Sequence, residues 1–142
     1  MAKNDYKSLR TNVPLEQKSP HTPMPKAKSV IGLDELVTIK DNNHKTVDVV
    51  ARIDTGAEWS SIDKKLFEQL SFGPVSGQRV IKSASGSSKR HTVEVTVIIK
   101  GKSCTSLFTI ADRSRLKYKL LIGQNILTMG FIIDPSIERI IK

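Results

Sequence analysis

Hydrophobic and polar residues alternate with the two-residue period of β-strands over much of the chain. From residue 91 to 100 every second residue is aliphatic, and Lys100-Gly101-Lys102 predicts a hairpin turn before a returning strand over 103–110. Other apolar runs predict strands over 30–39, 47–53, 79–84, 118–122 and 131–134, and a last strand around Ile137, Ile140 and Ile141. Short strands separated by turn signals favour a mainly β fold, a small closed barrel.

Two short helices interrupt this β pattern. Asp63 can cap a helix over 64–70, and residues 124–128 predict a helical turn that ends at Gly130. The order strand, turn, short helix therefore occurs twice, over 47–70 and again over 118–129, as in two loosely similar halves.

The first 28 residues differ from the rest of the chain. They hold four of the six prolines and little periodic apolar content, which predicts a disordered basic tail followed by one domain over 29–142. The tail carries six Lys or Arg and two acids, so the domain keeps +5 of the net charge of +9. A solubilising leader is the favoured interpretation, with a partner-binding arm or a self-cleaved segment as alternatives.

Composition limits the function classes. Cys104 is the one cysteine, which excludes an intrachain disulfide and favours a reducing, cytoplasmic setting. No secretory signal or apolar run of membrane-spanning length is present, so no membrane partner is expected. The histidines are scattered and no phosphate-binding Gly-rich loop occurs, so neither a metal nor another cofactor is predicted.

Basic residues cluster in two places. Lys89-Arg90 precedes His91, and Lys or Arg alternate at 113, 115, 117 and 119, which on a strand would place them on one face. A solvated face is one interpretation, and a groove that attracts an acidic peptide or a nucleic acid is the other. Aromatic residues make up only 5% of the chain, so stacking platforms are few, which argues against nucleic-acid binding.

One aspartate stands at the end of the apolar run 47–53, in Asp54-Thr55-Gly56-Ala57-Glu58. Asp-Thr-Gly alone is compatible with an ordinary turn. A second segment, Leu120-Leu121-Ile122-Gly123-Gln124, follows about seventy positions later. In this order and spacing the two segments resemble the retropepsin-like aspartic peptidases, over roughly residues 30–135. The resemblance implies the acid-protease barrel.

The resemblance also implies roles for these residues. Asp54, Thr55 and Gly56 would be catalytic, and Ala57 and Glu58 would bind the substrate main chain. The loop over 84–90, with Ser85 and Gly86, lies where such enzymes carry a flap over the cleft. Because the chain has one Asp-Thr-Gly, the second aspartate would come from a second copy in a homodimer.

Two details refine this expectation. The family often has an arginine after the aliphatic-Gly element, where this chain has Gln124, so a neutral hydrogen bond would replace a charge pair that involves Glu58. Residues 30–32 and 131–135 look like a microbial branch often labelled ATP-dependent zinc protease and associated with ligases that add glutamates. That branch implies acidic, glutamate-rich substrates. The alternatives are a non-catalytic peptide-binding module on this fold and a basic nucleic-acid-associated protein.

Overall fold

The computed structural model describes residues 27–75, 77–84 and 86–142, so the predicted tail lies almost wholly outside this part of the chain. The described strands are β1 (Ser29–Ile31), β2 (Asp34–Lys40), β3 (Thr46–Ile53), β4 (Ser60–Asp63), β5 (Gly77–Ser83), β6 (Gly86–Ile99), β7 (Lys102–Ala111), β8 (Leu120–Ile122) and β9 (Phe131–Ile133). The described helices are α2 (Lys64–Glu68) and α3 (Gln124–Leu127).

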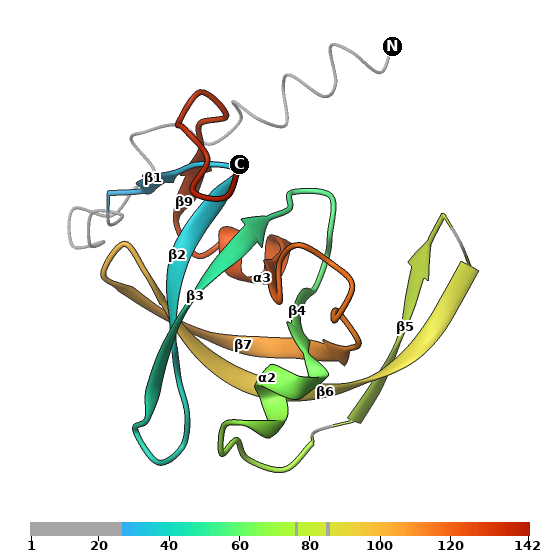
Figure 1. Ribbon diagram of the computed structural model, residues 1–142. Helices are drawn as coiled ribbons and strands as arrows, with labels where there is room; N and C mark the ends of the chain where they lie inside the picture. Colours follow the sequence, from blue (N-terminus) through green and yellow to red (C-terminus); the bar gives the residue numbers. More distant parts are fainter. Residues whose placement is uncertain (1–26, 76, 85) are drawn as a thin grey trace, which may run out of the picture.

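Most of these strands form one closed barrel (Figure 1). The strand order is β2-β3-β8-β4-β7-β6, and β6 pairs again with β2, which closes the ring. β5 lies outside the ring and pairs only with the first half of β6, so the β5–β6 hairpin projects from the barrel. The predicted mainly β, closed barrel with two short helices is therefore confirmed.

Side-chain alternation explains where the core lies. On β6 the side chains of Val93, Val95, Val97 and Ile99 are buried, as the two-residue period predicts. They join aliphatic residues of the other barrel strands and the ring of Phe108. Cys104 is buried in the same core, and this burial raises the pKa of its thiol.

The segment between β7 and β8 does not match the sequence prediction. Residues 112–119 form turns and bends rather than a strand with an alternating basic face. The Nζ of Lys119 donates to the carbonyl oxygens of Arg113, Ser114 and Leu116 at 2.9, 2.7 and 3.1 Å, which folds the segment around one ammonium group. In this segment Arg113 is buried, whereas Arg115 and Lys117 are exposed.

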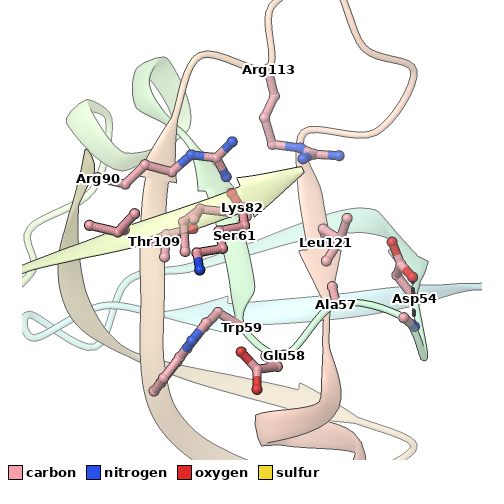
Figure 2. A pocket seen from close by; sticks show the side chains of 13 residues that line it. Asp54, Ala57, Glu58, Trp59, Ser61, Lys82, Arg90, Thr109, Arg113 and Leu121 are labelled. Atoms are coloured by element: carbon pink, nitrogen blue, oxygen red, sulfur yellow. Dashed lines mark hydrogen bonds between the residues drawn. The ribbon is translucent and has the colours of Figure 1, made fainter. Parts of the chain in front are cut away.

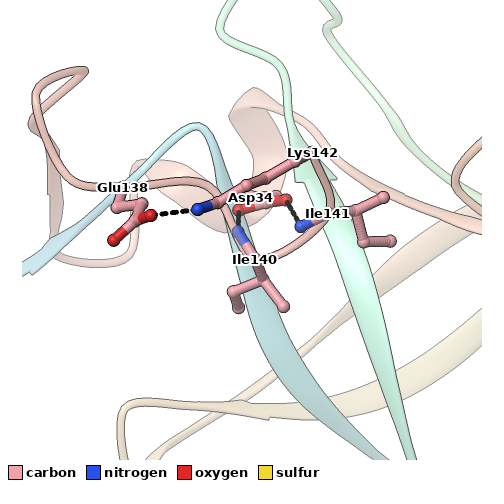
Figure 3. A network of polar contacts seen from close by, with 5 residues as sticks. All are labelled: Asp34, Glu138, Ile140, Ile141 and Lys142. Atoms are coloured by element: carbon pink, nitrogen blue, oxygen red, sulfur yellow. Dashed lines mark hydrogen bonds and ion pairs between the residues drawn. The ribbon is translucent and has the colours of Figure 1, made fainter.

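The predicted last strand around residues 137–141 is also absent from the described structure. Instead, the buried carboxylate of Asp34 accepts hydrogen bonds from the backbone N–H groups of Ile140 and Ile141 at 2.8 and 3.0 Å (Figure 3). The hydroxyl of Tyr118 donates to the same carboxylate at 2.9 Å. The C-terminal donors are thus satisfied by one side chain, and no partner strand is required.

No helix in the described part of the chain is both long and apolar enough to cross a membrane.

Candidate active site

The Asp-Thr-Gly turn is placed by the parallel pairing of β3 with β8. Ile53 lies opposite Ile122, so both strands end at the same point of the barrel. The backbone N–H of Asp54 donates to the carbonyl oxygen of Ile122 at 2.9 Å. The side-chain Oδ1 of Asp54 accepts from the backbone N–H of Gly56 at 2.9 Å, which fixes the carboxylate on its own turn.

Gly123 brings the second segment against this turn. A Cβ at this position would lie 2.7 Å from the carbonyl oxygen of Ala57 and 2.8 Å from backbone atoms of Trp59. Only glycine permits this approach. Beyond it, the N–H of Gln124 donates to the carbonyl oxygen of Ala57 at 2.7 Å, and the N–H of Asn125 donates to that of Glu58 at 3.2 Å. The loop after Asp54 is therefore held by the start of α3.

A polar network of buried and half-buried groups supports the same loop, and the sequence analysis missed it. The Oδ1 of Asn125 accepts from both the backbone N–H and the hydroxyl of Ser60, at 2.9 and 2.8 Å. Its Nδ2 donates to the carbonyl oxygen of Leu107 at 2.7 Å, and the Ser60 Oγ accepts from the N–H of Gly123 at 2.9 Å. These bonds tie β4, β7 and α3 together behind the active-site loop.

Gln124 makes the neutral hydrogen bond that was expected in place of a charge pair, but to another group. Its Nε2 donates to the backbone carbonyl oxygen of Thr55 at 2.8 Å. Among the described residues the Gln124 side chain makes no hydrogen bond to the Glu58 side chain, which instead lines the cavity.

A cavity of about 800 Å³ opens above the Asp54 turn (Figure 2). Its lining combines the floor residues predicted from the sequence with residues from β4, β5, β6, β7 and the 112–119 segment. The lining residues are Asp54, Gly56, Ala57, Glu58, Trp59, Ser61, Val80, Ile81, Lys82, Arg90, Thr109, Arg113 and Leu121.

The β5–β6 hairpin contributes to this cavity, at positions other than those expected for a flap. Val80, Ile81, Lys82 and Arg90 line it. Gly86 sits at the exposed tip of the hairpin, with a φ of 123°. Ser85 lies outside the described residues. The hairpin is also joined to the active-site loop, because the guanidinium of Arg79 stacks 4.2 Å from the centre of the Trp59 ring.

Arg113 is the functional candidate that the sequence analysis misplaced on a strand face. Its Nε donates to the carbonyl oxygen of Tyr118 at 2.9 Å, and its backbone N–H donates to the Asp63 carboxylate at 2.7 Å. Burial lowers the pKa of Arg113, and the charges of Arg90 and Arg52 lower it further, against the opposite influence of Asp63 and Asp54. An arginine remains charged under such shifts. The cavity therefore holds a buried positive charge within electrostatic reach of Asp54.

Comparison with known families identifies the chain. Residues 64–142 match the family described as RimB-like, retropepsin-like aspartic endopeptidase RimB. This match covers more than half of the chain. The chain belongs to this family. Because the matched segment starts after the Asp-Thr-Gly turn, the assignment to the RimB-like family is independent of that motif.

Solved structures show the same fold as this RimB-like chain. A Legionella pneumophila protein of unknown function, Lpg0085 (DUF785), has a TM-score of 0.55 and 19% identity over 80% of this chain and 98% of its own. EIAV protease complexed with the inhibitor HBY-793 has a TM-score of 0.54 and 20% identity, over 78% of this chain and 91% of its own. The comparison with curated proteins gave no significant match. Within the described residues, no three His, Cys, Asp or Glu side chains gather as metal ligands would.

Proposed function

We propose that the domain over residues 29–142 is an aspartic endopeptidase that acts as a homodimer with one Asp54 per copy. The observation that carries this proposal is the Asp54 carboxylate, fixed on the Asp-Thr-Gly turn at the floor of the 800 Å³ cavity. The RimB-like family and the retropepsin-like barrel support it.

The proposed chemistry needs two carboxyl groups. One carboxylate accepts a proton from water, whose oxygen attacks the scissile carbonyl carbon. The other carboxyl group protonates the departing amine nitrogen. Two carboxyls held about 3 Å apart share one proton, because both cannot ionise at that distance, so one acts as base while the other acts as acid.

The second carboxyl is proposed to come from the same residue of a second copy. Thr55 and Gly56 are exposed in the single chain, beside the partly exposed Asp54, so a two-fold axis can bring two such turns together. The Gln124 bond to the Thr55 carbonyl then holds the turn in shape for this contact.

The other roles expected for the site residues are assigned from the lining of the cavity. Gly56, Ala57 and Glu58 lie on its floor, where a substrate main chain would pass. The β5–β6 hairpin, with Gly86 at its tip and Ser85 beside it in the sequence, is proposed to act as the flap. Its anchor is the Arg79–Trp59 contact.

We further propose that the substrate is an acidic peptide or protein segment. The cavity is lined by Lys82, Arg90 and Arg113, and the domain carries +5. Such charges raise the local concentration of acidic segments. Cleavage of acidic peptides is therefore expected to weaken as salt rises, because exposed charges are screened over about 8 Å at physiological ionic strength.

The test is digestion of a peptide library at several pH values by the wild type and by Asp54→Asn. The expected result is cleavage by the wild type, and a loss of turnover of about 10²–10⁴-fold or more in the variant. Specific activity should also fall on dilution below the dimer dissociation constant. Full activity of Asp54→Asn would end the proposal. Peptide binding without cleavage by the wild type would favour the non-catalytic binding module.

A further inference from the structure

Ser61 is an anomaly in the wall of the cavity. Successive residues of β4 point to opposite sides, so Ser60 faces the Asn125 network while Ser61 faces the cavity. Ser61 is only 3% exposed, and its hydroxyl is the one buried side-chain polar group without a hydrogen-bond partner among the described residues. Such a group is costly to bury, and a ligand in the cavity that accepts its hydrogen bond would offset this cost.

The surroundings of Ser61 define the chemistry of that ligand. Thr109 on the neighbouring strand is also buried and lines the cavity, and Arg113 is only 8% exposed. Figure 2 shows Ser61, Thr109, Lys82 and Arg90 together on one side of the cavity, with Asp54 on the other.

The basic groups of this wall have no direct ion-pair partner within the described residues, although Asp63 and Asp54 lie within electrostatic range of Arg113. The charge of Arg90 lowers the pKa of Arg113, so the two guanidinium groups lie within electrostatic range of each other. No ion pair of Lys82, Arg90 or Arg113 is found in the described part of the chain. Like charges held together in a poorly solvated site favour an anion between them.

We propose that Ser61, Arg90 and Arg113 form a subsite that binds the side-chain carboxylate of one substrate residue beside the scissile bond. The Ser61 hydroxyl donates to this carboxylate, and the two guanidinium groups supply charge-assisted hydrogen bonds. This inference rests on the proposed peptidase function and adds the residues that select the acidic side chain. It differs from long-range attraction, because a direct subsite distinguishes glutamate from glutamine at one position of the peptide.

The test uses pairs of peptides that differ only by Glu or Gln at each position flanking the cleaved bond. The wild type should prefer Glu at one position by about 10²-fold in kcat/KM, given the usual strength of hydrogen bonds to charged groups. Ser61→Ala should reduce that preference about tenfold, and Arg113→Gln should reduce it further. In Ser61→Ala, kcat/KM for the Glu peptide should therefore fall more than kcat/KM for the Gln peptide.

Controls separate recognition from folding. Arg115→Gln, an exposed arginine of the same segment, should keep the full Glu preference. Ser61→Ala removes an unpartnered hydroxyl, so its thermal midpoint should not fall. Arg113→Gln loses the bond from Arg113 Nε to the Tyr118 carbonyl oxygen and can unfold the protein for that reason. Ser61→Ala then still tests the subsite.

The outcomes distinguish this subsite from the proteolysis itself. Cleavage that depends on Asp54 but keeps its Glu preference in Ser61→Ala would overturn the subsite and leave the peptidase proposal standing. If the wild type cleaves none of the peptides, the subsite is tested by calorimetry instead. The affinities of the same Glu and Gln peptides are then measured for the wild type and for Ser61→Ala. Equal affinity of the two proteins for the Glu peptide would then refute the subsite.

Discussion

Replacing Gly123 by alanine tests whether the close approach of β8 and α3 positions the catalytic turn. The added methyl group would lie 2.7 Å from the Ala57 carbonyl oxygen and 2.8 Å from the carbonyl carbon and oxygen of Trp59. These are backbone atoms, so no rotamer change relieves the overlap. The loop that follows Asp54 must move, or α3 must move away from it.

The expected cost follows from the geometry. Overpacking a rigid site costs about 1–3 kcal/mol, and three backbone contacts below 3 Å place Gly123→Ala at the upper end. For a domain of this size, about 3 kcal/mol corresponds to a fall of roughly 10 °C or more in Tm. Turnover measured below Tm should also fall, because a displacement of about 1 Å in a catalytic group can cost about 10²-fold.

The assay combines thermal unfolding with peptide cleavage below Tm. Gly73→Ala is the matched control, since its added methyl group would meet only the end of the Asn42 side chain at 3.3 Å, which can move. That control should unfold within a few degrees of the wild type and keep its activity. A Gly123→Ala protein with an unchanged Tm and wild-type turnover would refute the packing argument.

Three further predictions concern the groups that hold the fold and the turn. Burial raises the pKa of Asp34, but the backbone hydrogen bonds from Ile141 and Ile140 outweigh it and lower that pKa, so the stabilisation is complete above about pH 3.9 and is lost as pH falls through the folded value. Urea unfolding from pH 6 to 2 should therefore show a steeper acid loss for the wild type than for Asp34→Ala, and equal slopes would contradict this. Asn125→Ala leaves buried donors and acceptors unpaired and should cost at least about 2 kcal/mol in the same assay. Gln124→Ala should move the dilution midpoint of activity to higher protein concentration, and an unmoved midpoint would separate this residue from dimer formation.

The local pattern of the sequence was sufficient for the barrel and for the position of the Asp54 turn. The alternation on β6, the Asp63 cap of α2 and the glycine after β8 are all local signals, and the structure contains each of them. Such signals indicate which side chains face the core and where a helix begins, because both features depend on residues that are close in the sequence.

Features that depend on distant contacts could not be predicted in this way. Arg113 belongs to an alternating basic series, yet it is buried, with its Nε bonded to the Tyr118 carbonyl and its backbone N–H bonded to the Asp63 carboxylate. The isoleucines near the C-terminus look like a strand, yet Asp34, more than a hundred residues earlier, binds their backbone. The role of Ser61 depends on what faces it across the cavity, which a single strand does not reveal.

The central claim is that each active site contains one Asp54 from each of two copies. Its most direct test is cleavage activity in mixtures of wild type and Asp54→Asn at constant total protein, after the copies have been allowed to exchange. Mixed dimers hold one carboxylate and should be inactive, so activity should follow the square of the wild-type fraction. Activity that falls in direct proportion to the wild-type fraction would show that each chain works alone, which would contradict the shared site.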